Sequence, residues 1–102
     1  MKGRVVVLKE YLKPFVIEEY EVPDPEPGAT VLRITQAGIC GSDLHMYNPD
    51  MKSAMEEGLI LGHEAIGIVS EVGPEVKTLA AGDRVIILPV IACGECFYCK
   101  RE

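Results

Sequence analysis

The sequence predicts a mainly β fold, an antiparallel barrel or sandwich of five or six short strands. β-Branched and apolar runs alternate with glycine and proline, one run has the period of two of a half-buried strand, and only two short stretches look helical. With 102 residues, the chain is long enough for one domain with one hydrophobic core. We therefore expect a single small β domain.

Five segments have the composition of strands. The first is a compact β-branched run, the second mixes apolar and acidic residues, and the third alternates with a period of two. The fourth ends in a Gly-Pro-Glu turn, and the fifth follows a Gly-Asp pair. Their ranges are 5–8, 15–22, 30–36, 65–72 and 85–88.

The remaining segments are predicted to be connections or short helices. Three prolines within 23–28 cannot donate ladder hydrogen bonds, so this segment should be an extended linker or a turn. Ser42 is a candidate N-cap for a helix over 43–47, because its hydroxyl can accept an orphan backbone N–H. A second helix over 51–57 would end at Gly58 as its carboxyl cap.

Composition and charge exclude several classes of protein. Apolar residues make up 48% and charged residues 25%, as in soluble globular domains, so disorder and fibrous repeats are excluded. A net charge of -6 repels nucleic-acid phosphates and anionic lipid, so we expect neither as a partner. No apolar run approaches the roughly 20 residues of a membrane span, and we expect a cytoplasmic protein.

One group of residues has the chemistry of a catalytic metal site. It comprises Cys40, Asp43, His45, His63 and Glu64, with glycines around them that allow sharp backbone turns. Thiolate, imidazole and carboxylate together suit a catalytic zinc with one open position. The alternative makes Cys40 a small buried apolar side chain and His63 a hydrogen-bonded core histidine.

A second group is a cysteine knuckle near the carboxyl end. Cys93, Cys96 and Cys99 stand at successive three-residue steps, on a turn that Gly94 makes flexible. The main use of such a pattern is a tetrahedral zinc-thiolate site. The alternative, a redox Cys-x-x-Cys pair, usually sits at a helix start beside a parallel strand, and no such unit precedes this one.

Four stretches together resemble the zinc-containing medium-chain alcohol dehydrogenases in order and spacing. They are Gly38-Ile-Cys40-Gly-Ser-Asp43-Leu-His45, Gly62-His63-Glu64-Ala-Ile-Gly67, Gly82-Asp83-Arg84-Val85 and the cysteine knuckle. The similarity runs over 3–102 and covers the first part of the family's catalytic domain. Glycine at position 41 is similar to the polyol and threonine dehydrogenase branches.

The resemblance implies a fold and a domain assignment. We expect 1–102 to be a partial GroES-like catalytic domain with an antiparallel β-barrel, truncated, and a zinc-knuckle lobe that begins near residue 90. These residues contain no G-x-G-x-x-G turn, so we expect no nucleotide-binding domain and no NAD-binding residues among them.

The resemblance also implies roles for individual residues. Cys40 and His63 match ligands of the family's catalytic zinc, with Glu64 as an adjacent or exchanging ligand and a further ligand beyond position 102. Ser42 and His45 match its proton relay, and Asp43 matches the carboxylate behind a ligating histidine. Cys93, Cys96 and Cys99 match the structural-zinc lobe, whose fourth cysteine would come a few residues later.

The implied activity is oxidation of a small alcohol to an aldehyde or ketone. Zinc would polarise the alcohol oxygen, and hydride would pass to NAD or NADP in a full-length relative. Because each zinc site lacks one ligand here, we expect this chain alone to be inactive. Homo-oligomeric assembly is left open.

Two competing interpretations lead to other functions. A non-catalytic zinc-binding or co-chaperonin-like β-barrel module would use only the knuckle and would leave Cys40, His63 and Glu64 apart. A zincless quinone-reductase relative would not require the knuckle together with Cys40 and His63, so it ranks last.

Overall fold

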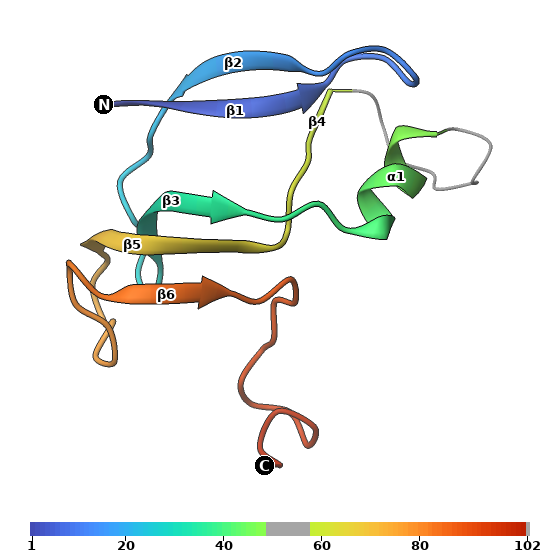
Figure 1. Cartoon of the computed structure of the whole chain (residues 1–102). Coiled ribbons are helices and arrows are strands. Elements are labelled where there is room, and N and C mark those ends of the chain that lie inside the picture. The colour runs from blue at the N-terminus through green and yellow to red at the C-terminus, as the bar shows by residue number, and fades with distance from the viewer. Residues whose placement is uncertain (49–57, 102) are drawn as a thin grey trace.

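The computed structural model describes residues 1–48 and 58–101, which form two three-stranded antiparallel sheets. One sheet has the strand order β2-β1-β4 and the other the order β3-β5-β6 (Figure 1). The elements are β1 (Lys2–Leu8), β2 (Val16–Glu21), β3 (Thr30–Ala37), α1 (Gly41–Tyr47), β4 (Leu59–Ile60), β5 (Ala65–Val72) and β6 (Arg84–Ile87).

The first sheet is a hairpin with a short third strand. β1 pairs with β2 along its length, and its last two residues also pair with β4. Val7 pairs with both neighbouring strands and Leu8 with β4. Both side chains are buried. β4 pairs with the end of β1, and the residues that follow it, 61–64, lead into β5 of the other sheet.

The second sheet has β5 at its centre, between β3 and β6. Val69 on β5 is buried and forms the core of the described residues together with Val7 and Leu8 of the other sheet. Gly67 allows β3 to come close, because a Cβ at this position would lie 3.0 Å from the Arg33 carbonyl oxygen. Each sheet thus contributes buried side chains from one of its strands.

The proline-rich linker is fixed against the turn that follows β5. Gly28 donates its N–H to the Pro74 carbonyl at 2.7 Å, and Gly73 donates to the Ala29 carbonyl at 2.8 Å. A Cβ on Gly73 would overlap the Glu26 carbonyl oxygen, so only glycine fits there. The prediction of an extended linker or a turn over 23–28 agrees with the structure, in which 22–26 belong to no helix or strand and 27–28 form a turn.

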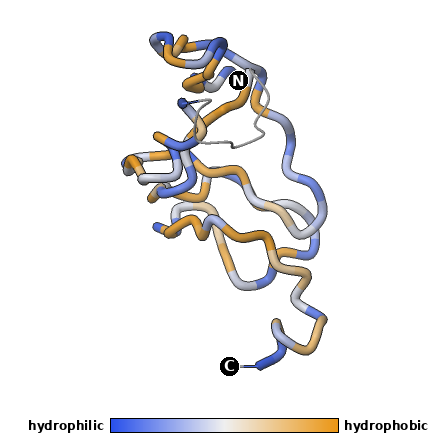
Figure 2. The backbone as a smooth tube through the Cα atoms, turned by 90° about the vertical axis from the view of Figure 1, so that its right-hand side faces the viewer, coloured by the Kyte–Doolittle hydropathy of each residue, from blue (hydrophilic) through white to orange (hydrophobic). Residues whose placement is uncertain are grey.

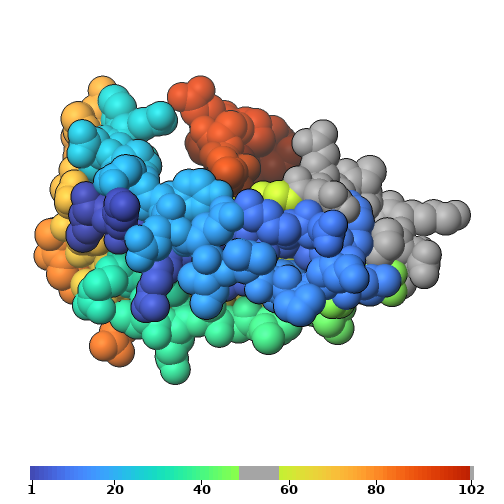
Figure 3. All heavy atoms as spheres, turned by 90° about the horizontal axis from the view of Figure 1, so that it is seen from above, coloured from blue at the N-terminus to red at the C-terminus, as the bar shows by residue number. Residues whose placement is uncertain are grey.

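Beyond β6 the chain leaves the sheets. Residues 88–101, here called the carboxyl-terminal lobe, run away from β6 as an irregular segment (Figures 1 and 2). Seen from above, the β1–β2 hairpin covers the middle of the molecule, and the lobe stands to one side (Figure 3). The cysteine knuckle therefore lies outside the two sheets.

The predicted mainly antiparallel β class is confirmed, and all five predicted strands are present with small shifts at their ends. The two-residue strand β4 was not predicted, because two residues carry no periodic signal. Ser42 as N-cap is wrong: α1 begins at Gly41, and the extended residue before it is Cys40. The Asp43 carboxylate accepts the Cys40 N–H, so the helix is capped at Cys40, two residues before the predicted N-cap.

The second predicted helix, over 51–57, lies outside the described residues. Within residues 1–48 and 58–101, no helix has the length and apolar character that crossing a membrane requires.

Candidate metal centres

Two chain segments bring Cys40, His63 and Glu64 together. Cys40 ends the connection between β3 and α1, and the other two residues lie between β4 and β5. Ligand-type atoms of the three side chains all lie within 4.8 Å of one another. The two segments are tied by the Gly38 N–H, which donates to the Glu64 carbonyl at 2.8 Å. We call this group the first centre.

Gly62 determines how the chain enters the first centre. Its φ of 113° lies in the region that residues with a Cβ rarely adopt, so the turn from β4 to His63 needs glycine at this position. Residues 61–64 lead from the first sheet to the second. The His63 side chain faces α1, where the Ser42 hydroxyl lies 3.1 Å from its Nε2.

Asp43 serves the helix start and the histidine at the same time. Its Oδ2 accepts the Cys40 N–H at 2.8 Å, and its Oδ1 lies 3.4 Å from His63 Nδ1. Oδ1 is buried and has no hydrogen-bond partner among the described residues. A carboxylate at Nδ1 leaves Nε2 as the nitrogen that is free to bind an ion, and the Ser42 hydroxyl lies 3.1 Å from Nε2.

Hydrogen bonding shifts the titration of the two central groups in opposite directions. The Ser42 hydroxyl, the Ser42 backbone N–H and the His63 ring all lower the pKa of the Cys40 thiol. The hydrogen bond to Cys40 and the negative charge of Asp43 raise the pKa of His63, against the effect of desolvation. Both shifts stabilise the charged form of the group, the Cys40 thiolate and the His63 imidazolium, relative to the isolated side chains.

The donor set of the first centre fits a zinc ion. One thiolate, one imidazole and one carboxylate are the ligand types of catalytic zinc sites, where three protein donors leave one position open. The buried, unpartnered Asp43 Oδ1 stands where a ligating histidine needs an acceptor for its other N–H. The types of the three donors and the position of Asp43 behind His63 therefore both fit a zinc site.

His45 lies outside the first centre. It is exposed in the last turn of α1, three residues after Ser42 and therefore on the same face of the helix. Ser42 is half-buried beside Nε2 of His63. Ser42 therefore lies beside the first centre, and His45 lies on the same helix face at the surface.

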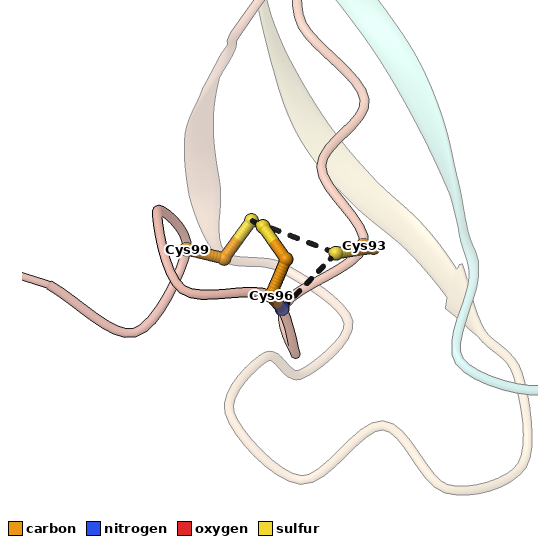
Figure 4. Close-up of side chains that lie close together, drawn as sticks. All are labelled: Cys93, Cys96 and Cys99. Carbon is orange, nitrogen blue, oxygen red and sulfur yellow. Dashed lines mark hydrogen bonds between the residues drawn. The ribbon is translucent and has the colours of Figure 1, made fainter.

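The cysteine knuckle gathers three sulfurs on one turn (Figure 4). Cys99 Sγ lies 3.8 Å from Cys93 Sγ and 3.5 Å from Cys96 Sγ. Four-coordinate zinc at about 2.3 Å from each ligand sets neighbouring sulfurs about 3.8 Å apart, so these separations fit one tetrahedral ion. Gly94, with φ of 74°, provides the turn.

Backbone N–H groups stabilise the thiolate form in the knuckle. Those of Glu95 and Cys96 point at the sulfur of Cys93 and, with the neighbouring thiols, lower the pKa of that thiol to about 7. The backbone at Cys99 similarly lowers the pKa of Cys96. Since thiolates bind zinc, the folded turn favours the binding form before the ion arrives.

Two hollows adjoin the first centre, and the sequence reasoning missed most of the residues that line them. One, of about 470 Å³, borders His63 and Glu64 and is lined by residues of all three strands of the second sheet, among them Gln36, Ile66 and Ile86. The other, of about 410 Å³, is more apolar and contains the Phe15–Tyr47 ring pair, whose centroids lie 5.4 Å apart. Alternation along the strands was the available signal, but it did not identify the face beside the first centre.

Comparison with known proteins identifies the family. The family model described as "Alcohol dehydrogenase GroES-like domain" matches residues 26–102. The chain is 47% identical over 85 residues to an uncharacterised zinc-type alcohol dehydrogenase-like protein of Bacillus subtilis, over 80% of this chain and 22% of that protein. It is 42% identical over 86 residues to an L-threonine 3-dehydrogenase of Thermococcus kodakarensis, over 82% of this chain and 25% of that protein.

Solved structures agree with the sequence matches. An alcohol dehydrogenase zinc-binding domain protein from Burkholderia ambifaria matches with a TM-score of 0.85 and 36% identity, over 97% of this chain and 26% of that one. An Escherichia coli alcohol dehydrogenase in complex with NADH matches with a TM-score of 0.80 and 32% identity, over 96% and 28%. A zinc-binding dehydrogenase from Sinorhizobium meliloti bound to NADP matches with a TM-score of 0.77 and 31% identity, over 95% and 28%.

The chain spans about a quarter of the length of these relatives. Its match to the family model covers well over half of its own residues, and the β architecture agrees with the solved structures. The chain therefore belongs to the zinc-type alcohol dehydrogenase family, through its GroES-like domain.

Proposed function

We propose that this chain provides the first catalytic-zinc ligands of a zinc-dependent alcohol dehydrogenase. Cys40 and His63 would hold the ion, with Glu64 as an adjacent or exchanging ligand. The proposal is supported above all by the meeting of these three side chains within 4.8 Å, from segments more than twenty residues apart in sequence. A module that used only the cysteine knuckle would have no reason to bring them together.

The chain's own residues would position the metal ligand and move a proton. A bound zinc ion supplies Lewis acidity, which lowers the pKa of an alcohol oxygen. Asp43, 3.4 Å from Nδ1 of His63, would orient the ring, whose Nε2 lies 3.1 Å from the Ser42 hydroxyl. The Ser42 hydroxyl can accept a proton and donate its own, and His45 on the same helix face can carry the proton to solvent.

The proposed reaction is oxidation of a small alcohol to an aldehyde or ketone, with hydride transfer to NAD or NADP. The NADH and NADP in solved relatives support this choice of cofactor. These 102 residues contain no G-x-G-x-x-G turn, so we propose that they contribute metal ligands and a proton path but do not bind the dinucleotide. Cytosolic placement, where thiols stay reduced, suits a chain whose four cysteines are all free.

We propose a structural zinc for the knuckle. Sulfurs 3.5 and 3.8 Å apart on one turn support a closed thiolate site, which would stabilise the carboxyl-terminal lobe and take no part in the chemistry.

Metal counting by native mass spectrometry tests both sites. The zinc-loaded chain should hold two ions, Cys40→Ala should hold one, and Cys96→Ala should also hold one. The two donor sets share no residue, so the two losses should be independent and the double variant should hold no ion. A Cys40→Ala chain that still holds two ions would remove the first centre from the proposal.

Turnover by the chain alone is tested separately. Zinc-loaded protein should produce no NADH or NADPH when it is mixed with NAD or NADP and a panel of primary, secondary and polyhydric alcohols. Stoichiometric formation of either reduced cofactor would show that the 102 residues complete a reaction without further sequence.

A further inference from the structure

Gly38 lies directly against the carboxylate of Glu64. A Cβ at position 38 would lie 2.9 Å from Glu64 Oε2 and 3.6 Å from the Glu64 Cβ. The first separation is shorter than ordinary van der Waals contact, which begins near 3.4 Å. The carboxylate therefore occupies space that any side chain at position 38 would take.

Other reasons for glycine at this position do not apply. The φ of Gly38 lies outside the positive region, in contrast to that of Gly62, so the backbone there accepts a residue with a Cβ. The Gly38 N–H that donates to the Glu64 carbonyl is also present in alanine. An added methyl group would thus leave the backbone tie intact and act only on the Glu64 side chain.

The group that has to yield is the far end of a flexible, exposed side chain. Moving Oε2 by about 0.5 Å restores ordinary contact and costs the fold little. Metal–ligand distances, however, are held within about 0.2 Å in a working site. A shift that the fold tolerates therefore exceeds what a metal ligand tolerates.

We propose that Gly38 is a positioning residue of the first centre, whose missing side chain keeps the Glu64 carboxylate within reach of Cys40 and His63. The inference rests on the proposed zinc site and adds a residue that touches neither the ion nor the substrate. Gly41, in the same segment, provides a matched control, because no described atom beyond its chain neighbours and the backbone of its own helix lies within 4 Å of a Cβ built there.

The test measures Co²⁺ binding to the full chain in a Cys96→Ala background, where only the first centre is expected to bind. Gly38→Ala should weaken the Co²⁺ affinity about tenfold, which is the size of loss expected when the support of a ligand is removed. It should also change the visible absorption of bound Co²⁺. Gly41→Ala should stay within about twofold of the background protein. The thermal midpoints of the metal-free variants should coincide, which separates positioning from folding.

A double-mutant cycle assigns the effect to Glu64. In a Glu64→Ala background, Gly38→Ala should cause no further loss of affinity, because the group it displaces is absent. The inference is overturned if Gly38→Ala binds Co²⁺ like the background protein, or if the tenfold loss persists without Glu64. A background protein that binds no Co²⁺ would instead overturn the zinc site itself, and this inference with it.

Discussion

At the scale of single residues, Asp43 shows how one side chain serves structure and chemistry together. Its two carboxylate oxygens face different groups: Oδ2 accepts the Cys40 N–H at the start of α1, and Oδ1 lies 3.4 Å from Nδ1 of His63. A helix-capping carboxylate and a carboxylate behind a metal ligand are usually alternative interpretations of the same residue. Here the geometry is compatible with both, because the helix begins beside the histidine.

Asp43→Asn should separate these two contributions. The amide keeps an oxygen that can accept the Cys40 N–H, so the helix start should persist. The charge beside Nδ1 is lost, and zinc affinity should fall by about 10- to 100-fold. Competition with a chelator of known affinity measures the loss, and circular dichroism checks the fold; unchanged affinity would reduce Asp43 to a helix cap.

The thiol of Cys93 gives a pH prediction for the metal-free chain. Its pKa of about 7 is below that of an ordinary cysteine, near 8.5, so the reactive thiolate forms at lower pH. Alkylation of Cys93 by iodoacetamide, followed by peptide mass spectrometry with a chelator present, should therefore reach half its maximal rate near pH 7. In urea the backbone N–H groups lose their alignment, and the midpoint should return to about 8.5; identical midpoints in both conditions would contradict the proposed cause.

At the scale of elements, close backbone approach fixes how the connections are placed. The linker over 23–28 passes the turn after β5 so closely that the Glu26 carbonyl occupies the place of a Cβ on Gly73. Hydrogen bonds from Gly28 and Gly73 hold the two segments in this position. The linker thus joins the end of the first sheet firmly to the second.

Gly73→Ala should destabilise the chain. The clash is with backbone, which cannot swing aside as the Glu64 carboxylate can, so the free energy of unfolding should fall by about 1–3 kcal/mol. Urea denaturation followed by circular dichroism measures the change. Gly41→Ala, with open space around the new methyl group, should leave the midpoint nearly unchanged, and equal effects at the two positions would be evidence against the packing argument.

At the scale of the whole molecule, the two candidate metal sites differ in their setting. The first centre lies between α1 and the segment from β4 to β5, whereas the knuckle lies in the carboxyl-terminal lobe, where every described side chain from 88 to 101 is exposed. The order of the lobe should depend on its ion far more than the order of the sheets does.

Removal of the metal should therefore loosen the lobe first. With a chelator present, limited proteolysis should cut within 88–101 and leave the preceding sheets as a resistant product, since those strands keep their backbone pairing. The zinc-loaded chain should resist cleavage at the same sites. Mass spectrometry of the products checks this, and early cuts inside β1 or β5 would contradict it.

The sequence alone determined the features that depend on local spacing. Steps of three residues place Cys93, Cys96 and Cys99 on one turn, whatever surrounds them, and a β-branched run or a period of two indicates a strand in any context. The prolines within 23–28 likewise exclude a regular strand or helix there, whatever surrounds them. Family resemblance added Cys40 and His63, which their own spacing did not connect.

Only the tertiary structure decided which distant residues meet. The approach of Cys40 to His63 depends on the pairing of β4 with β1, which has no signal in a single sequence. It also depends on the positive φ of Gly62, where the glycine in the sequence allows a sharp turn but does not specify its direction. The contact between Gly38 and Glu64 is likewise visible only once β3 and β5 lie side by side. Local patterns reflect interactions along a few residues of chain, whereas a mixed-ligand centre depends on the long-range strand pairing that brings separate segments together.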